Sequence, residues 1–290
     1  MDENARIKMI SSILYVDEAI ITDMLILNEE FITKNKIDYV VHSFVSEDDR
    51  ERQRLFFELP IKLNKFIEIP YNIGISTTDI INTYYENKND IKYGNLNWQE
   101  IWENKGKMQT VDLYELNGWE ETSFDPQGLI VNILKILNVK KCEKIMEYGC
   151  GAGLLSTYLH DYEYYGLDYS PSLVSKHIQL LNNVVFNFSS VETIFKNKYF
   201  DYVIINSMLE YLNNIEEVKK TISEIERISK NGIYIANIRR VKHIVKKNKH
   251  KYDGEYTHLT IDSSFFENLK YTIVNSLYDS DRYDAYKILY

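Results

Sequence analysis

The chain is poor in the residues that interrupt regular secondary structure, with 11 glycines and 4 prolines among 290 residues. This scarcity indicates long helices and strands. Cysteine is scarcer still: Cys142 and Cys150 bracket a predicted strand, which at about 3.3 Å per residue puts their alpha carbons roughly 20 Å apart. That separation excludes a disulfide, and two cysteines without CxxC spacing make no zinc site. We therefore expect two free thiols and no metal.

Long apolar runs are also missing. No stretch approaches the length of a membrane span, and the start MDENARIKM lacks the apolar centre of a signal peptide. The net charge of −9 at pH 7 argues against general binding to nucleic acids or anionic membranes. The residues are 44% hydrophobic and 13% aromatic, enough for a sizeable core in one large domain or two modest ones. These features predict a globular, cytoplasmic protein.

The amino-terminal part has an α/β pattern. Apolar runs over residues 11–20 and 37–45 predict strands, and residues 23–35 predict a helix. The hydrophobic signal collapses over residues 86–97, which we interpret as a linker. The chain is therefore expected to have one region over residues 1–94 and a second over residues 95–290.

The second region alternates predicted strands with predicted helices, which indicates a parallel sheet covered on both faces. Residues 269–279 and 282–290 predict a closing hairpin that adds an antiparallel edge. The predicted strands cover residues 144–148, 164–168, 184–188, 200–206 and 232–238, and the predicted helices between them cover residues 151–160, 170–181 and 215–229.

The strongest chemical signal is KIMEYGCGAGLLS, residues 144–156. Three glycines, Gly149, Gly151 and Gly153, follow a strand directly and precede a predicted helix. Glycines let the backbone approach a ligand closely, and a helix N-terminus presents unpaired N–H groups. The next strand ends in Asp168, where an acid that binds ribose hydroxyls stands in nucleotide-binding βαβ units. The structural alternative is an ordinary turn, with Asp168 capping the next helix.

The GxGxG spacing differs from the GxGxxG of dinucleotide folds, which needs a glycine where Leu154 stands. With Glu147 two residues before the first glycine, the segment resembles the first motif of class I S-adenosylmethionine-dependent methyltransferases. The resemblance covers about residues 95–290 and continues in DYSPSLVSK, FDYVIINSMLEYL and SKNGIYIANI. It implies a Rossmann-like, mostly parallel seven-stranded sheet with an antiparallel last strand. It also implies S-adenosylmethionine as cofactor and S-adenosylhomocysteine as product.

The resemblance assigns cofactor roles residue by residue. The glycines would pass beneath the methionine part and the ribose, Asp168 would accept from the ribose hydroxyls, and Tyr169 would lie near the adenine. Glu147 would orient the loop or hold the amino group of the methionine part through water. Where many relatives carry an aspartate near the adenine, this chain has a serine. The full implied set is Glu147, Gly149, Gly151, Gly153, Asp168, Tyr169, Ser189, Ser190, Val191 and Asn206.

Residues for acceptor chemistry are expected beyond the carboxyl ends of the strands. Glu210 and Tyr211 follow the fourth strand, and His258 titrates near neutrality and could serve as a base. We name Glu210, Tyr211 and His258 as catalytic candidates. The alternatives are a solvated helix residue for Glu210 and a surface histidine for His258.

Residues 239–251 carry seven lysines and arginines in an otherwise acidic chain, which suggests an anionic acceptor. A solvated loop is the alternative. Tryptophans before the glycine loop could form a lid, or could only pack an extra helix. We name Trp119, Arg239 and Arg240 as substrate candidates.

The stretch YNIGISTTDI, residues 71–80, allows two interpretations. Gly74 can turn the chain while Ser76, Thr77 or Thr78 caps a helix. The stretch also resembles the GISTTD motif of cytidylyltransferases that join CTP to phosphocholine and related compounds. That resemblance covers residues 1–85, the second half of such a domain, and no HxGH motif is present. It implies a smaller, partial nucleotidyltransferase-like α/β domain that is degenerate, truncated or completed by another chain.

The sequence thus predicts methyl transfer to oxygen or nitrogen of a small phosphorylated or nucleotide-linked metabolite. Two alternatives stay open: a non-catalytic module that binds the cofactor and dimerises, and the methyltransferase part of a bifunctional enzyme. A homo-oligomer is compatible with each of them.

Overall fold

The computed structural model describes residues 3–22, 26–71, 98–119, 122–188, 193–241 and 258–289. The chain forms two compact units, Met1–Ala19 with Ile91–Tyr290 and Ile20–Asp90. The first nineteen residues therefore belong to the larger unit, although the sequence pattern grouped them with the amino-terminal region. The predicted linker over residues 86–97 lies outside the described residues.

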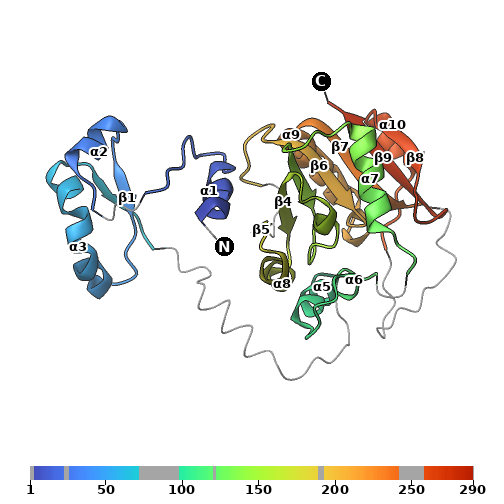
Figure 1. The fold of residues 1–290 in the computed structure, drawn as a ribbon, viewed down its shortest axis with the longest axis horizontal. Helices are drawn as coiled ribbons and strands as arrows, with labels where there is room; N and C mark the ends of the chain where they lie inside the picture. Colours follow the sequence, from blue (N-terminus) through green and yellow to red (C-terminus); the bar gives the residue numbers. More distant parts are fainter. Residues whose placement is uncertain are drawn as a thin grey trace. The chain divides into compact units, whose positions relative to one another are not determined.

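The larger unit contains a seven-stranded sheet with the order β5-β4-β3-β6-β7-β9-β8 (Figure 1). All neighbouring pairs up to β7 are parallel, and β9 runs antiparallel to both of its neighbours. The predicted sheet and its antiparallel edge are confirmed. The strands are β3 Lys144–Tyr148, β4 Glu163–Asp168, β5 Val184–Asn187, β6 Phe200–Asn206, β7 Ser229–Arg239, β8 Thr272–Asn275 and β9 Arg282–Ile288.

The strand order reverses between β3 and β6. From β3 the chain proceeds to β4 and β5 on one side, and then returns to place β6 on the other side of β3. Ligands of open α/β sheets bind beyond the carboxyl ends of the strands at such a switch point. Here the segments that follow Tyr148 and Asn206 border that position.

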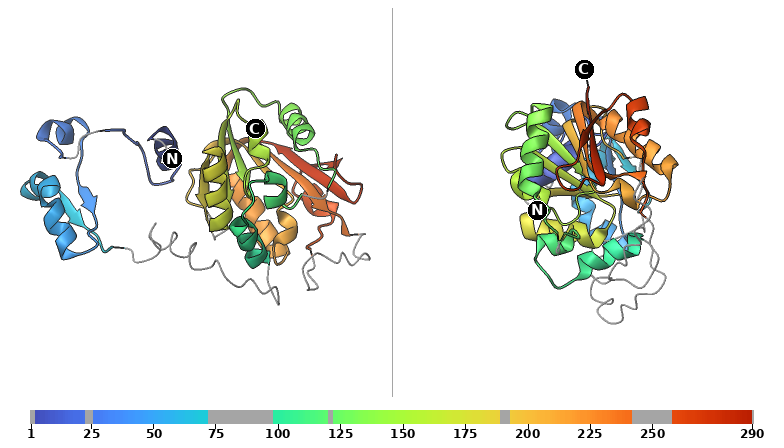
Figure 2. Two further views of the ribbon diagram at one scale, coloured as in Figure 1. Left: turned by 60° about the horizontal axis from the view of Figure 1, so that its bottom comes forward. Right: turned by 90° about the vertical axis from the view of Figure 1, so that its right-hand side faces the viewer.

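Helices cover both faces of the sheet (Figure 2). Alternate strand residues point to opposite faces, so Ile145 and Ile204 pack with α7 (Pro126–Leu137) and Met146 packs with α9 (Ile215–Ile228). The helix α8 (Pro171–Leu181) follows β4, and α10 (Ser263–Asn268) precedes β8. Burial on both faces explains the nearly continuous apolar runs of β3 and β6.

Local signals set the ends of these helices. The side chains of Asp125 and Ser170 accept hydrogen bonds from the N–H groups of Gly128 and Leu173, and a proline occupies the first position of α7 and of α8. Left-handed asparagines, Asn138 and Asn182, end the same two helices.

The helix predicted over residues 151–160 is reduced to a short 3-10 helix, η1 (Leu155–Tyr158). Gly153 has φ +94°, which is not helical. The hydroxyls of Ser156 and Thr157 donate to the carbonyl oxygens of Gly153 and Leu154, each at 2.7 Å. These local side-chain bonds compete with a regular helix.

The strand predicted over residues 11–20 is wrong. The described residues there contain one isolated antiparallel bridge, between Ile13 and Phe195. The helix α1 (Glu3–Ser11) comes just before Ile13 in the chain and packs beside β5. Of the helix predicted over residues 23–35, the described residues 26–35 contain α2 (Glu29–Lys34), which Asn28 caps.

The smaller unit has a parallel two-stranded sheet of β1 (Val40–His42) and β2 (Phe66–Glu68), joined through α3 (Glu47–Lys62). This is a βαβ arrangement. The motif at residues 74–79 lies outside the described residues. Two further helices, α5 (Trp98–Lys107) and α6 (Leu113–Leu116), belong to the larger unit. No helix in the described ranges is both long and apolar enough to cross a membrane.

Candidate active site

The loop after β3 needs its three glycines for packing as well as for backbone shape. Gly149, Gly151 and Gly153 have φ of +82°, +52° and +94°, the left-handed region that favours glycine. A β-carbon on each would contact a different element: Met208 Cγ at 2.6 Å, Asn117 Oδ1 at 2.3 Å and His177 Nε2 at 2.4 Å, respectively. Side chains from three segments therefore enclose this loop.

Hydrogen bonds hold the amides of the same loop. The N–H groups of Gly149 and Cys150 donate to the carbonyl oxygen of Leu167 at 2.7 and 3.0 Å. The Gly151 N–H donates to Asp168 Oδ2 at 2.8 Å, and the Ala152 N–H donates to Asn117 Oδ1 at 3.2 Å. The end of β4 thus fixes the loop that follows β3.

Asp168 retains capacity to bind more donors. Its side chain is only 6% exposed, and its second oxygen accepts from the Ser170 N–H at 2.9 Å. Burial raises the pKa of Asp168 to about 6, although the neighbouring backbone N–H groups act to lower it. The carboxylate is therefore ionised at neutral pH. Each carboxylate oxygen has two lone pairs, so acceptor capacity remains beyond the bonds from the backbone N–H groups.

Glu147 lies beneath the loop and is buried. Its carboxyl accepts a hydrogen bond from the Tyr164 hydroxyl at 2.7 Å. Burial raises the pKa of Glu147 to about 8, so the group is largely protonated at neutral pH. Cys150 is a buried free thiol whose pKa burial raises well above the ordinary value, and Cys142 is an exposed free thiol. Both cysteines are free, as expected.

A cavity of about 590 Å³ lies beside Tyr169, between the start of α8 and helix α5. The Glu103 carboxylate anchors α5 there, because it accepts from the Ser170 hydroxyl at 2.7 Å, the Ser172 N–H at 3.2 Å and the Ser172 hydroxyl. The Tyr169 hydroxyl donates to the carbonyl oxygen of Trp98 at 3.1 Å. Ser189, Ser190 and Val191 lie outside the described residues.

Glu210 forms a buried ionic cluster beyond the end of β6. It lies in the short helix η2 (Leu209–Tyr211), is 4% exposed and pairs with Arg239 Nε at 2.7 Å and Arg282 Nη1 at 2.9 Å. His258 Nε2 lies 3.9 Å from Glu210 Oε2. Burial acts to raise the pKa of Glu210, but the two arginines and His258 outweigh it and hold that pKa below its ordinary value. A carboxyl group whose pKa is lowered in this way is a weaker base than an ordinary glutamate.

Aromatic rings gather next to that cluster. The Trp98 ring centroid lies 4.9 Å from that of Tyr211 and 4.6 Å from that of His258, and Trp102 lies 5.1 Å from Tyr211. Burial raises the pKa of the Tyr211 hydroxyl well above its usual range. The structure thus brings the three catalytic candidates together with the first two tryptophans of α5.

The predicted substrate residues are separated. Trp119 stacks on Phe124 at 4.0 Å in a different aromatic group that includes Tyr278. Arg239 belongs to the Glu210 cluster, whereas the Arg240 guanidinium lies over the Tyr283 ring at 5.1 Å. The lysines of residues 242–251 lie outside the described residues.

Four contacting residues were missed from the sequence: Glu103, Asn117, His177 and Arg282. Arg282 had one usable signal, since a charged residue stands among buried positions of β9. Asn206, which was predicted, accepts from the Asn237 side-chain amide at 2.7 Å.

A family model described as a methyltransferase domain matches residues 139–284, which include the whole glycine loop and Asp168. No curated protein matched the chain. The comparisons do not support the resemblance of residues 1–85 to cytidylyltransferases, which stays a prediction.

Solved structures with the same fold include phosphoethanolamine N-methyltransferase 1 of Haemonchus contortus, in complex with phosphoethanolamine and S-adenosylhomocysteine. It is 11% identical with a TM-score of 0.50, over 74% of this chain and 50% of that one. An S-adenosylmethionine-dependent methyltransferase of Clostridium acetobutylicum is 12% identical with a TM-score of 0.49, and the match covers 61% of this chain and 96% of that one. A methyltransferase of Aquifex aeolicus that also depends on S-adenosylmethionine is 16% identical with a TM-score of 0.45, and the match covers 65% of this chain and 98% of that one. At these identities the likeness concerns the fold.

Proposed function

The chain belongs to the methyltransferase domain family, and we propose that it transfers the methyl group of S-adenosylmethionine to oxygen or nitrogen of a small anionic acceptor. One observation carries this proposal: the GxGxG loop and the Asp168 carboxylate are hydrogen-bonded to each other at the switch point of the sheet. That is where a nucleoside-containing ligand of an open α/β sheet binds.

The residues of the loop fit the cofactor. The glycines present backbone without side chains, and Asp168 keeps acceptor capacity for the ribose hydroxyls. The cavity beside Tyr169 is adjacent to the Asp168 backbone and can receive the adenine. The buried Glu147 carboxyl accepts a hydrogen bond from the Tyr164 hydroxyl, which favours a role in orienting the loop over direct contact with the ligand.

The sulfonium of the bound cofactor supplies an activated methyl group. The protein has then to align the acceptor and exclude water. The packed rings of Trp98, Tyr211 and His258 support water exclusion at the end of β6. His258 is the candidate base where the acceptor must lose a proton, and Glu210, with its low pKa, is better suited to orient His258 than to take the proton.

Charge near the acceptor position supports an anionic acceptor. Arg239 and Arg282 carry two positive charges against the single negative charge of Glu210, which leaves an excess of one positive charge in a buried cluster. Within the described residues, Arg239 bonds Glu210 through Nε, and its two terminal nitrogens make no hydrogen bond or ion pair. A phosphate or a nucleotide diphosphate suits such donors.

The test has two stages. Calorimetry with S-adenosylhomocysteine measures cofactor binding, and release of S-adenosylhomocysteine from S-adenosylmethionine then reports turnover with phosphoethanolamine, cytidine diphosphate conjugates and uncharged analogues. We expect binding and a preference for anionic acceptors. Tight binding without turnover on any acceptor would favour the alternative, a non-catalytic cofactor-binding module.

A further inference from the structure

We propose that His177 is a positioning residue that holds the glycine loop in the shape that receives the cofactor, an inference that rests on the proposed methyltransferase function. His177 lies on α8, is completely buried and touches the loop that follows β3. It lies about nine residues beyond Asp168 in sequence, where no motif marks it.

Each ring nitrogen of His177 has a defined partner. Nδ1 lies 3.2 Å from the carbonyl oxygen of Gly151, which can only accept, so Nδ1 carries the proton. Nε2 lies 3.1 Å from the Asn183 side-chain nitrogen, which can only donate, so Nε2 is the acceptor. The two contacts together select one neutral tautomer.

Ser156 completes the network. The Asn183 amide also donates to the Ser156 oxygen at 2.9 Å, and the Ser156 hydroxyl donates to the carbonyl oxygen of Gly153 at 2.7 Å. His177 and Ser156 therefore hold the carbonyl groups of two of the three loop glycines, while Asp168 and Asn117 hold N–H groups. Both the N–H and the C=O groups of the loop are therefore hydrogen-bonded to side chains from outside the loop or just after it.

Steric contact reinforces the hydrogen bonds. A β-carbon on Gly153 would lie 2.4 Å from Nε2 and 2.6 Å from Cε1 of His177, so the ring occupies the space that the missing side chain leaves. A protonated ring would direct a second N–H at the Asn183 donor. Burial accordingly lowers the pKa of His177 to about 4, which keeps the ring neutral under ordinary conditions.

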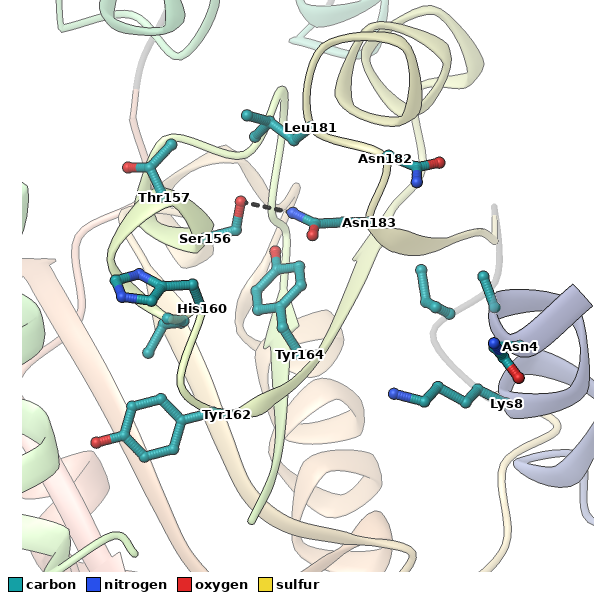
Figure 3. Close-up of a pocket in the computed structure, with 13 residues that line it drawn as sticks. Asn4, Lys8, Ser156, Thr157, His160, Tyr162, Tyr164, Leu181, Asn182 and Asn183 are labelled. Atoms are coloured by element: carbon teal, nitrogen blue, oxygen red, sulfur yellow. Dashed lines mark hydrogen bonds between the residues drawn. The ribbon is translucent and has the colours of Figure 1, made fainter. Parts of the chain in front are cut away.

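The outer members of this network line a cavity of about 470 Å³ at the amino ends of β4 and β5, on the opposite edge of the sheet from the cofactor loop. Figure 3 shows Asn183 donating to Ser156 there, with the Tyr164 ring beside them. His177 itself does not line that cavity. His177 therefore acts on the glycine loop, and its effect is to be measured through cofactor binding.

Two substitutions of His177 distinguish the role of Nδ1 from that of Nε2. In His177→Asn the amide nitrogen stands as many bonds from the backbone as Nδ1, so the bond to Gly151 can re-form. In His177→Gln the amide stands at the position of Nε2, and the Gly151 carbonyl loses its donor. We expect His177→Asn to bind S-adenosylhomocysteine within about threefold of the parent, and His177→Gln to bind at least tenfold more weakly.

The kinetic readout distinguishes positioning from general stability. At saturating S-adenosylmethionine the kcat of both variants should stay within about twofold of the parent, with the loss confined to the KM for the cofactor. Gln179→Asn, an exposed change on the same helix, serves as the control and should alter neither constant. Melting temperatures of the two His177 variants report whether folding differs between them.

Ser156→Ala provides a second route if either His177 variant fails to fold. It removes the donor to Gly153 and a hydroxyl oxygen that lies 3.3 Å from His177 Nε2, but it leaves the contact of Nδ1 with Gly151 in place, and weaker cofactor binding with an unchanged kcat is expected. Equal cofactor affinity in parent, His177→Gln and Ser156→Ala would overturn the positioning role, as would equal weakening by both His177 variants. A parent protein that does not bind S-adenosylhomocysteine at all would instead refute the proposed function.

Discussion

The Asp168 carboxylate accepts a 2.8 Å hydrogen bond from the Gly151 N–H, which joins the end of β4 to the middle of the glycine loop. The same carboxylate accepts from the Ser170 N–H at the start of α8. Two segments that are separate in sequence, the glycine loop and the turn from β4 to α8, therefore meet on one buried acid. Any ligand that adds donors to Asp168 binds to a group that is already oriented, which reduces the entropic cost of binding.

Replacing Asp168 with alanine should weaken S-adenosylhomocysteine binding. Hydrogen bonds to a charged group contribute about 1.5 to 3 kcal/mol, which corresponds to an affinity loss of roughly 10-fold to 150-fold. Calorimetry on the folded variant measures this loss. Asp168→Asn, which keeps the shape of the side chain and removes its charge, is the matched control. Its affinity for S-adenosylhomocysteine should lie between those of the parent and Asp168→Ala. Unchanged affinity in Asp168→Ala would remove Asp168 from the cofactor site.

Gly151→Val should abolish cofactor binding. The backbone at Gly151 has φ +52°, which a β-branched residue resists, and its β-carbon would lie 2.3 Å from Asn117 Oδ1. The variant tests the loop assignment only if circular dichroism shows a folded protein. Pairing the change with Asn117→Ala removes the side-chain clash and leaves the backbone strain. Normal binding by a folded Gly151→Val protein would contradict the assignment.

Glu147 makes stability depend on pH. Its pKa rises from 4.5 to about 8 on folding because the carboxyl is buried, so the folded state binds more protons than the unfolded state between those values. Stability therefore falls as pH increases through this window, by up to about 1.4 kcal/mol per pH unit. Asp168 and His177 titrate at lower values, near 6 and 4 when folded and at 3.8 and 6.5 when unfolded.

Between pH 7 and 8, Glu147 is therefore the group of these three that contributes most to the pH dependence. Glu147→Gln, which resembles the protonated acid, should flatten the dependence of urea unfolding on pH across that interval. Tyr164→Phe removes the hydroxyl that donates to Glu147 and should raise the pKa of the acid further. A slope that is identical in parent and Glu147→Gln would show that the carboxyl is ionised in the folded protein.

The parts of the site that the sequence predicted share a local cause. The glycines of the loop and Asp168 are recognisable because each stands directly at the end of an apolar strand, and strand ends of a parallel sheet meet at one edge. Glu210 was found by the same reasoning, and Arg239 was named as a substrate candidate, but the pairing of Arg239 with Glu210 and the presence of Arg282 beside them were not predicted. Arg282 lies 72 residues from Glu210 in sequence, so no local pattern links them.

The remaining residues were hidden for a related reason. His177 stands in an amphipathic helix, where its position alone does not reveal contact with a loop that ends about twenty residues earlier. Asn117 reaches the loop from a four-residue helix. The strand expected over residues 11–20 failed because Ile13 makes a single bridge to Phe195 without a continuous partner strand, and the apolar side chains of Leu14, Tyr15 and Ile20 are exposed.

The charge of the acceptor can be tested at Arg239 and Arg240. Arg240 lies over the Tyr283 ring and 3.4 Å from Asn275 Oδ1, and within the described residues it is not bonded to Glu210, so Arg240→Ala removes a positive charge without breaking the Glu210 ion pairs. Arg239→Ala also removes an ion pair from buried Glu210, which destabilises the cluster. Arg239→Lys keeps the charge and loses the planar guanidinium, and it separates these two effects.

If the cluster binds an anionic acceptor, Arg239→Ala should raise the KM for that acceptor by about 10-fold or more, because a charge-assisted contact contributes on the order of 1.5 to 3 kcal/mol. Affinity for S-adenosylhomocysteine should change far less, since the cofactor lies on the other side of the methyl group. Arg239→Lys should retain part of the preference for anionic over neutral acceptors, and the double alanine variant should lose most of it. Should the double variant treat anionic and neutral acceptors in the same ratio as the parent, the two arginines serve only Glu210 and the surface, and the acceptor class must be sought among neutral metabolites.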